Sequence, residues 1–258
     1  MILKLCLYSF VFYHLRKMEG VKRTQLLVSS DSSRIITTFN PPLVFPERCS
    51  YEMALTRLET YYSFANITET NNKLKISFDG GKVWTDIEIP VGCYEIYAIN
   101  KTLQRLIVAA GGKPSLIIFS PNRNTLKCVL EIKDVKYMVD FTVQNCIRTL
   151  LGFDKGKYKF GRTEGQSIVN IMDVNSILVK CDVIGSSTLN GVAEPIIYSF
   201  FPNVSPGCKI VEIAHNLTFL PLSTNTISTM TCWLTDQNNK ELNLRGEKLT
   251  ISLIIQPC

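Results

Sequence analysis

The chain has 258 residues, a formal net charge of +6, and 46% hydrophobic against 19% charged residues. This balance excludes a disordered protein, and the length allows one large domain or two small ones. The Lys and Arg residues are scattered without a dense basic tract, so we expect no dedicated nucleic-acid site.

The first 17 residues differ from the rest of the chain. They combine a short apolar stretch with basic residues, a pattern typical of secretory signals. However, Tyr13 and His14 break the apolar run, and no small-residue cleavage site follows. We therefore predict that residues 1–17 are an upstream extension or leader outside the fold, with Met18 as the natural start. No other stretch approaches the roughly 20 apolar residues of a membrane-spanning helix, so we expect no membrane partner.

Apolar and polar residues alternate along most of the chain, as they do in strands with one buried face. The segment KLKISFDGGKVWTDIEI predicts a hairpin that turns at Asp79-Gly80-Gly81. Four further strands are predicted in LKCVLEI, VKYMVDF, ILVKCDV and LTISLII. The residues expected on the buried faces are Leu74, Ile76, Phe78, Val83, Thr85, Ile87, Ile89, Leu126, Cys128, Leu130, Ile132, Val135, Tyr137, Val139, Phe141, Ile177, Val179, Cys181, Val183, Leu249, Ile251, Leu253 and Ile255.

Two segments have helical spacing instead. The first ends in two glycines, and its periodic apolar residues are Ile96, Ile99, Leu103 and Leu106. The second, NCIRTLLGF, predicts one short helix that Asn145 caps and Gly152 ends. With the strands between them, these segments form a helix–strand–strand–helix block at about 91–153.

The predicted fold is mostly β, a jelly-roll β-sandwich whose helix–strand–strand–helix block is an insertion or a small second lobe. The jelly-roll domain would then span residues 18–258. About eleven strands can be counted where a single jelly roll needs eight, so a two-domain chain with a boundary near Phe153 to Gly165 stays open. The Gly-rich segment 155–166 is predicted to be a long surface loop.

The nine cysteines include no closely spaced pair, which argues against a zinc site and against a disulfide framework. Several lie within apolar runs, where Cys acts as a small hydrophobic residue, and free thiols favour a reducing compartment. Four N-x-S/T sequons occur, and they matter only if the chain is secreted. Their asparagines are Asn66, Asn100, Asn203 and Asn216.

Catalytic patterns are sparse. The two histidines, His14 and His215, lie far apart in sequence, and no nucleophile-elbow, dinucleotide or phosphate-loop motif occurs. Asp236, Glu241 and Glu247 lie close in sequence, and a pair of carboxylates would suit a β-sandwich glycosidase. Solvated charges beside a turn explain them as well. We predict a protein that is not an enzyme, without catalytic, cofactor or metal residues.

The segment TMTCWLTDQNNKELNLRGEKLTISL predicts two strands joined by a polar connection around Gln237 to Lys240. Strand alternation places Trp233 on the less buried side, where Trp serves as an interface anchor or as simple packing. The charged side chains nearby are expected to pair with each other or with a neighbouring subunit. The possible subunit-interface residues are Trp233, Asp236, Arg245 and Glu247.

Several stretches, taken in order over roughly residues 28–255, resemble the penton-like minor capsid proteins of Polinton (Maverick) elements and their adintovirus relatives. These stretches are SSDSSRIITTFNPPLVF, YEMALTRLETYYSFANI, IPVGCYEIYAINKTLQRLI, RTLLGFD, SIVNIMDVNSILVKCDVI, IIYSFFPNVSPGCKIVE and WLTDQNNKELNLRGEKLTISL. The leader lies outside this resemblance.

The resemblance implies a jelly-roll capsid subunit that forms homopentamers at icosahedral vertices. Its partners would be further copies of itself and a major capsid protein with two jelly rolls. It would be located in the virion and assembled in the nucleus or cytoplasm of the host cell, without secretion. The alternative is a secreted lectin-like or TNF-like β-sandwich binding protein, which the leader and the sequons motivate.

Overall fold

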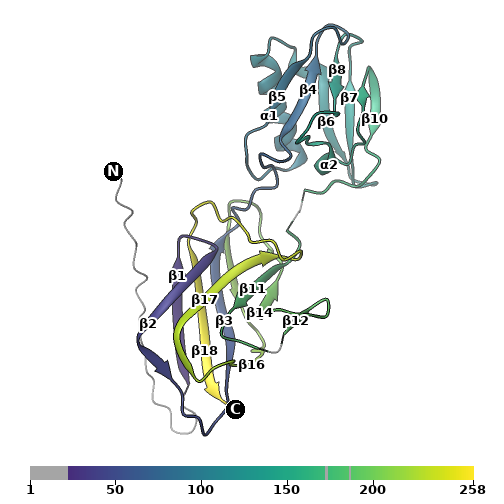
Figure 1. Cartoon of the computed structure of the whole chain (residues 1–258). Helices are drawn as coiled ribbons and strands as arrows, with labels where there is room; N and C mark the ends of the chain where they lie inside the picture. Colours follow the sequence, from purple (N-terminus) through teal and green to yellow (C-terminus); the bar gives the residue numbers. More distant parts are fainter. Residues whose placement is uncertain (1–22, 172–173, 186) are drawn as a thin grey trace, which may run out of the picture. The chain divides into compact units, whose positions relative to one another are not determined.

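The computed structural model describes residues 23–171, 174–185 and 187–258. The chain divides into two compact units (Figure 1). Among the described residues, the first unit contains those from 23 to Phe64 and those from Val174 onward, and the second contains those from Ala65 to 171. The predicted leader at 1–17, the predicted start at Met18 and the residues Cys6 and His14 lie outside the described ranges. Within those ranges, no helix combines the length and apolar character needed to span a bilayer.

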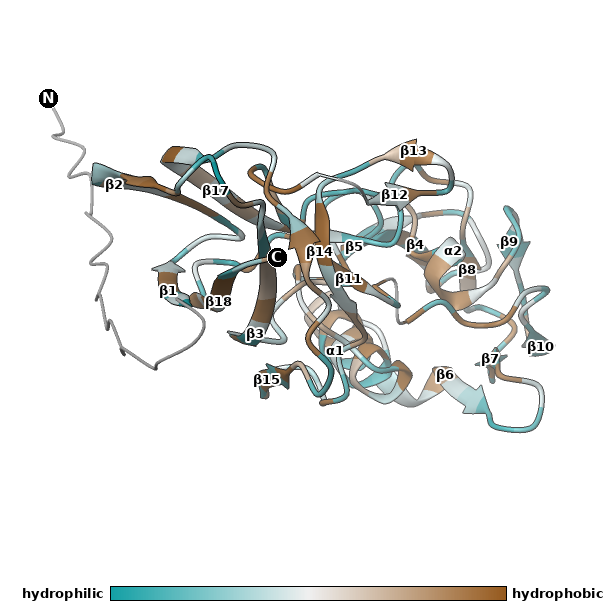
Figure 2. Cartoon of the chain, turned by 90° about the horizontal axis from the view of Figure 1, so that it is seen from below, coloured by the Kyte–Doolittle hydropathy of each residue, from teal (hydrophilic) through white to brown (hydrophobic). Residues whose placement is uncertain are grey.

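The first unit consists of strands. Strands such as β3 carry both hydrophobic and hydrophilic residues, in keeping with one buried and one exposed face (Figure 2). The strands of this unit are β1 (Thr24–Ser30), β2 (Arg34–Val44), β3 (Tyr51–Tyr61), β11 (Ile177–Cys181), β12 (Thr188–Leu189), β13 (Val192–Ala193), β14 (Ile196–Phe200), β15 (Lys209–Ile213), β16 (Leu220–Pro221), β17 (Thr226–Asp236) and β18 (Leu249–Pro257).

The strand order of this unit is that of a jelly roll. One sheet runs β1–β18–β3–β15, with the short β16 also paired to β3, and the other runs β14–β11–β17–β2. Leaving aside β16 and the small β12–β13 hairpin, eight strands remain, and they pair first with last, second with seventh, third with sixth and fourth with fifth. A long hairpin rolled into two facing sheets has this order. The predicted mostly-β, jelly-roll fold is confirmed.

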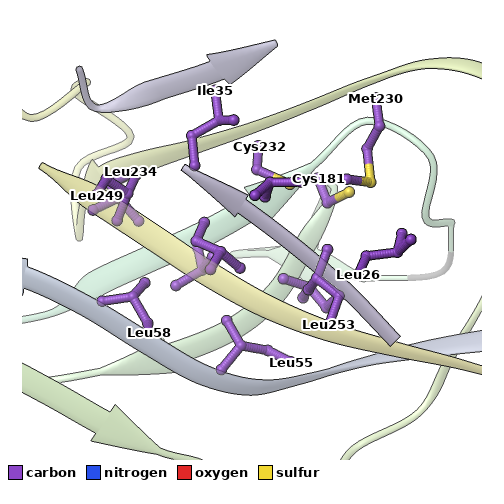
Figure 3. Close-up of a cluster of buried hydrophobic side chains, with 14 of the residues drawn as sticks. Leu26, Ile35, Leu55, Leu58, Cys181, Met230, Cys232, Leu234, Leu249 and Leu253 are labelled. Carbon is purple, nitrogen blue, oxygen red and sulfur yellow. The ribbon is translucent and has the colours of Figure 1, made fainter. Parts of the chain in front are cut away.

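The two sheets enclose one hydrophobic core, part of which is drawn in Figure 3. Every second residue of β18 points into this core, and all four predicted ones, from Leu249 to Ile255, are at most 1% exposed. In β17 the alternation changes phase at a β-bulge between Ile227 and Thr229. Because the bulge inserts one residue, Ile227 and Met230 are both buried although they are three residues apart.

The last two strands lie in different sheets. A tight turn does follow β17 at residues 237–240, as predicted, and a bridge between Thr235 and Glu241 closes it. The chain then crosses over, with Leu242 and Leu244 buried in the core, and β18 pairs with β1 and β3. The C-terminal segment is therefore a crossing between the two sheets of the jelly roll, and not a hairpin of two paired long strands.

The second unit combines two small antiparallel sheets with two helices. Its sheets run β10–β7–β6 and β5–β4–β8–β9, and its apolar residues form a core of their own. Its elements are β4 (Lys73–Ser77), β5 (Thr85–Glu88), α1 (Ile96–Ala109), the 3-10 helix η1 (Pro114–Leu116), β6 (Ile117–Asn122), β7 (Lys127–Ile132), β8 (Met138–Asp140), α2 (Arg148–Leu151), β9 (Lys157–Tyr158) and β10 (Gly161–Glu164).

The unit is inserted between β3 and β11, so the jelly roll is discontinuous in sequence. It is longer than the predicted block at 91–153, because β4, β5, β9 and β10 also pair within it. The segment 155–166, predicted to be a surface loop, contains β9 and β10. A boundary near Phe153 to Gly165 is wrong as well, because Phe153 is buried in the core of this unit. The ends of the unit meet where Asn66 Nδ2 donates to the carbonyl of Ile171 at 3.0 Å.

Both predicted helices form. The helix α1 buries Ile96, Ile99 and Leu103 as expected. Gly152 ends α2 in the left-handed conformation with φ of 78°, also as expected, but Asn145 does not cap it. Ile147 occupies that position, and Asn145 lies in the preceding turn with φ of 55°.

The hairpin predicted at 73–89 forms as β4 and β5, but its connection is wider than the predicted turn. The strands pair only as far as Ile76 with Thr85. The side chain of Asp79 organises the connection by accepting hydrogen bonds from the backbone N–H groups of Lys82 and Val83. Val83 is consequently 66% exposed, and two other residues expected to be buried, Leu126 and Val135, are also exposed.

None of the eight described cysteines is in a disulfide. Four are buried, namely Cys128, Cys146, Cys181 and Cys232. Burial raises the pKa of the Cys128 thiol to about 12. Such a thiol stays protonated and packs as a small apolar side chain.

Candidate functional site

Trp233 lies on the outer face of the sheet that contains β17. Its neighbours along the strand, Cys232 and Leu234, point into the core and are at most 1% exposed, whereas Trp233 is half-buried. The strand register places Arg34 of β2 on one side of Trp233 and Lys180 of β11 on the other. Strand alternation therefore placed Trp233 on the correct face.

Arg34 joins Trp233 to the turn that follows β17. Its guanidinium carbon lies 5.0 Å from the centroid of the Trp233 ring, within the range of a cation–π contact. Its Nη2 atom is 2.8 Å from Glu241 Oε2, and Ser33 Oγ donates to Glu241 Oε1 at 3.2 Å. The hydrogen bond and charge of Arg34 lower the pKa of the Glu241 carboxyl.

We expect that the substitution Arg34→Gln raises the pKa of Glu241 toward its ordinary value of 4.5. Removal of the guanidinium takes away the hydrogen bond that holds the carboxylate ionised. A carboxyl with a lowered pKa stabilises the fold above its unfolded-state pKa and loses this contribution as the pH falls through its folded-state pKa. NMR titration of labelled glutamates measures this shift.

Glu59 is the internal control for that titration. Its pKa is lowered by a hydrogen bond from Lys209. Both residues lie on the sheet that does not contain Arg34. This pKa should be the same in the parent protein and in Arg34→Gln. A Glu241 pKa that does not move would show that Arg34 is not its main partner in solution.

Asp236 is committed to the turn. It is 5% exposed, and its Oδ1 atom accepts hydrogen bonds from the backbone N–H groups of Asn238 and Lys240 at 2.8 and 2.9 Å. Buried carboxylates that accept such bonds fix the backbone of a turn. The side chain of Asp236 therefore holds the turn, and its Oδ1 atom is not available to a neighbouring subunit.

Arg245 and Glu247 flank Gly246 on the crossing between the two sheets, and both are exposed. Arg245 has φ of 56° and its backbone N–H donates to Asn243 Oδ1 at 2.8 Å. Among the described residues, no ion pair joins Arg245 to Glu247. The structure therefore places Trp233 and Asp236 three residues apart on β17, with Asp236 buried at its end, and leaves Arg245 and Glu247 as exposed charges beyond the turn.

The three carboxylates that a glycosidase would need have separate surroundings. Asp236 holds the turn, Glu241 binds Arg34, and Glu247 is exposed. His215 is also exposed. Within the described part of the chain, no group of His, Cys, Asp or Glu side chains is arranged to hold a metal ion.

A cluster that the sequence analysis missed lies beside Trp233. Lys180 is 1% exposed, and its Nζ atom is 2.5 Å from Glu194 Oε2 and also donates to Asn239 Oδ1. Asn239 Nδ2 donates to Glu194 Oε1 at 2.7 Å. The signal in the sequence was a lysine within the apolar run ILVKCDV, on the face opposite Val179 and Cys181. Such a lysine needs partners that only the folded chain supplies.

The opposite sheet exposes apolar side chains on its edge strand. Val211 and Ile213 of β15 are 44% and 52% exposed. They lie beside a charged group in which Glu59 pairs with both Arg57 and Lys209. Exposed Val and Ile on an unpaired strand edge are typical of surfaces that contact another chain.

Comparisons with known proteins give a likeness in fold to solved structures. No protein-family model matches the chain, and no curated protein matches it either. Among solved structures, the chain is similar to the mavirus penton protein, with 10% sequence identity, coverage of 92% of this chain and 100% of that chain, and a TM-score of 0.49.

Proposed function

We propose that this protein is a structural capsid subunit, a penton-like minor capsid protein that forms homopentamers at icosahedral vertices. The observation that carries the proposal is the jelly-roll strand order, in which eight strands pair first with last across two sheets. Jelly rolls build viral capsids because the sandwich packs around a symmetry axis and leaves short sheet edges. The ordered stretches that resemble Polinton and adintovirus minor capsid proteins support the same role.

Self-association and contact with a major capsid protein that has two jelly rolls are part of this proposal. The exposed charges Arg245 and Glu247, together with Trp233, are the proposed interface residues. Trp233 lies on β17 before the turn that Asp236 holds, and Arg245 and Glu247 lie on the crossing that follows this turn.

The secreted β-sandwich alternative predicts a glycan at Asn66 or Asn216. The side-chain nitrogen of Asn66 donates hydrogen bonds to the carbonyls of Tyr94 and Ile171, at 2.7 and 3.0 Å, and its oxygen accepts one from the N–H of Tyr94. A glycan would replace one of the two hydrogens on that nitrogen and so remove one of these donated hydrogen bonds, whereas Asn216 is exposed. This geometry argues against a glycan at Asn66, and a glycan found at Asn216 would support the secreted alternative.

The proposal is tested by co-expression of the full chain with a major capsid protein that has two jelly rolls. We expect a ring of five copies by mass photometry and cryo-electron microscopy, and incorporation into the shells. The double variant Arg245→Ala/Glu247→Ala should weaken ring formation by about tenfold, the effect of roughly 1.4 kcal/mol of lost binding energy.

Lys248→Ala is the matched control, because Lys248 is exposed beside Glu247 on the same crossing. It should leave both the ring and incorporation unchanged. A chain that stays monomeric at every concentration and never enters the shells would overturn the proposed function. If the double variant still forms rings, the subunit interface is formed by other residues, and the exposed edge of β15 is the next surface to test.

A further inference from the structure

The cluster of Lys180, Glu194 and Asn239 holds the three groups of a self-catalysed cross-link. Lys180 supplies an amine, Asn239 a carboxamide, and Glu194 a carboxylate that contacts both. We propose that Lys180 and Asn239 form an intramolecular isopeptide bond, with Glu194 as the catalytic acid and base. This inference is independent of the proposed function, because it needs only the folded jelly roll.

Three separate segments position the groups. Lys180 lies on β11, where it is directly opposite Trp233 of β17. Glu194 follows the β12–β13 hairpin, and its N–H donates to the carbonyl of Ser187 at 3.0 Å, while the next residue accepts a hydrogen bond from Cys181. The backbone beside Lys180 thus fixes the place of Glu194.

Asn239 is held by the turn after β17. Its φ of 68° lies in the left-handed region, and its N–H donates to the carbonyl of Asp236 at 3.1 Å. The side chain of Asp236 fixes the residues on both sides, Asn238 and Lys240. The carboxamide is therefore presented to Lys180 by a turn with little freedom, and such positioning supplies much of the barrier reduction in intramolecular reactions.

The contacts match the steps of the reaction. Lys180 Nζ touches Asn239 Oδ1, so the carbonyl carbon Cγ is one bond from the atom that the amine contacts. Glu194 touches Nζ through Oε2 and the leaving nitrogen Nδ2 through Oε1. A single carboxylate can then take a proton from the nucleophile and return one to the leaving group.

The atoms balance without a co-reactant. Glu194 takes a proton from the Lys180 ammonium, and the neutral amine attacks Cγ of Asn239, which moves the carbonyl electron pair onto Oδ1. The tetrahedral centre collapses as the Cγ–Nδ2 bond breaks, and Nδ2 takes the proton from Glu194. The new amide nitrogen gives up its remaining extra proton, and the products are the isopeptide bond, an ammonium ion and the regenerated carboxylate.

Burial of the amine suits this chemistry. The side chain of Lys180 is 2% exposed and that of Glu194 is 19% exposed. Burial limits the access of bulk water to the amine and to the carbonyl carbon that it attacks. Because the resting pair is ionic, with the pKa of Glu194 lowered by Lys180, proton transfer precedes attack, and we expect the bond to form slowly after folding.

Intact mass spectrometry of the purified full chain tests the proposal. After incubation at neutral pH, we expect a mass lower than the sequence mass by one ammonia. Trypsin should no longer cleave after Lys180, and tandem spectra should show the peptide of Lys180 joined to the peptide of Asn239. The share of cross-linked chain should rise with time to completion.

Two variants and one control locate the bond. Glu194→Gln keeps the shape of the side chain but removes the base, and Asn239→Gly keeps the left-handed backbone but removes the carboxamide. Both should retain the full mass, with Asn239→Gly made together with Asn238→Ala so that no Asn-Gly pair can form a succinimide. Asn238→Ala alone, on the neighbouring amide, should still lose ammonia, which excludes succinimide formation at Asn238, and the joined peptides of Lys180 and Asn239 distinguish the cross-link from a succinimide at Asn239. A folded parent chain that keeps its full mass and an unmodified Lys180 after long incubation would overturn the proposal, as would ammonia loss mapped to another asparagine.

Discussion

The substitution Gly152→Ala is expected to destabilise the inserted unit by about 3 kcal/mol or more, from a left-handed backbone and an overpacked contact. Gly152 ends α2 with φ of 78°, and an added Cβ would lie 2.2 Å from the backbone oxygen of Ser167. The neighbour is main chain and cannot rotate away. Ser167 N–H also donates to the Gly152 carbonyl at 3.0 Å, so relief of the clash would break this bond.

Hydrogen exchange measures the loss of stability at named amides. The N–H of Val169 donates to Leu126, and that of Asn170 donates to Leu150. Both amides follow the contact with Gly152, so both should exchange faster in Gly152→Ala. Amides of the jelly roll should keep their protection, because the two units have separate hydrophobic cores.

Gly111→Ala is the matched control. Gly111 follows α1 with φ of 83°, but an added Cβ there would meet no heavy atom within 4 Å. The expected loss of unfolding free energy is then only the cost of a left-handed alanine backbone, about 1–2 kcal/mol. The difference between the two variants isolates the clash with Ser167, and equal losses in both would show that the segment at Ser167 yields without cost.

The sequence predicted those elements whose identity is local. The alternation in LTISLII placed Leu249, Ile251 and Leu253 on the buried face of β18, since a strand with one buried face repeats every two residues. The positive φ of Gly152 was also predictable from local sequence, because a glycine that follows an amphipathic helical turn commonly ends the helix in the left-handed conformation.

Features that depend on distant partners were missed or misplaced. The strands β9 and β10 are short and lie in a Gly-rich segment, and they form because β8 and β7 offer edges to pair with. The alternation of apolar residues also continues past the ends of strands, as at Leu126, which is 65% exposed with φ of 57°. The alternation of apolar residues in the sequence therefore does not show where the hydrogen-bonded pairing of a strand ends.

In the candidate sites, too, local features were predictable and contacts between distant segments were not. The exposed side of Trp233 followed from alternation, whereas its partner Arg34 comes from a strand about 200 residues earlier, at a sequence separation of 207 from Glu241. The Lys180 cluster joins three segments, with a sequence separation of 59 between Lys180 and Asn239. No spacing rule connects these residues, because the jelly roll brings together strands from opposite ends of the chain.

The substitution Leu253→Ala is expected to cost about 2–5 kcal/mol of unfolding free energy, confined to the jelly roll. Leu253 is fully buried (Figure 3), and β18 places it directly between Leu26 of β1 and Leu55 of β3. All three side chains point into the core between the sheets. Removal of its isobutyl group leaves a cavity that three paired strands cannot collapse without breaking register.

Chemical denaturation of Leu253→Ala and Ile254→Ala, followed by hydrogen exchange, separates burial from strand position. Ile254 is the next residue on β18, half-buried on the outer face opposite Gln25 and Ala54. Its truncation should cost less than about 1 kcal/mol, because less apolar surface leaves water there on folding. Amides of the inserted unit should be unaffected by either change. If both variants lost similar stability, β18 would stabilise the jelly roll mainly through its backbone pairing with β1 and β3. A much larger loss in Leu253→Ala would show that the last strand stabilises the jelly roll through the core it closes.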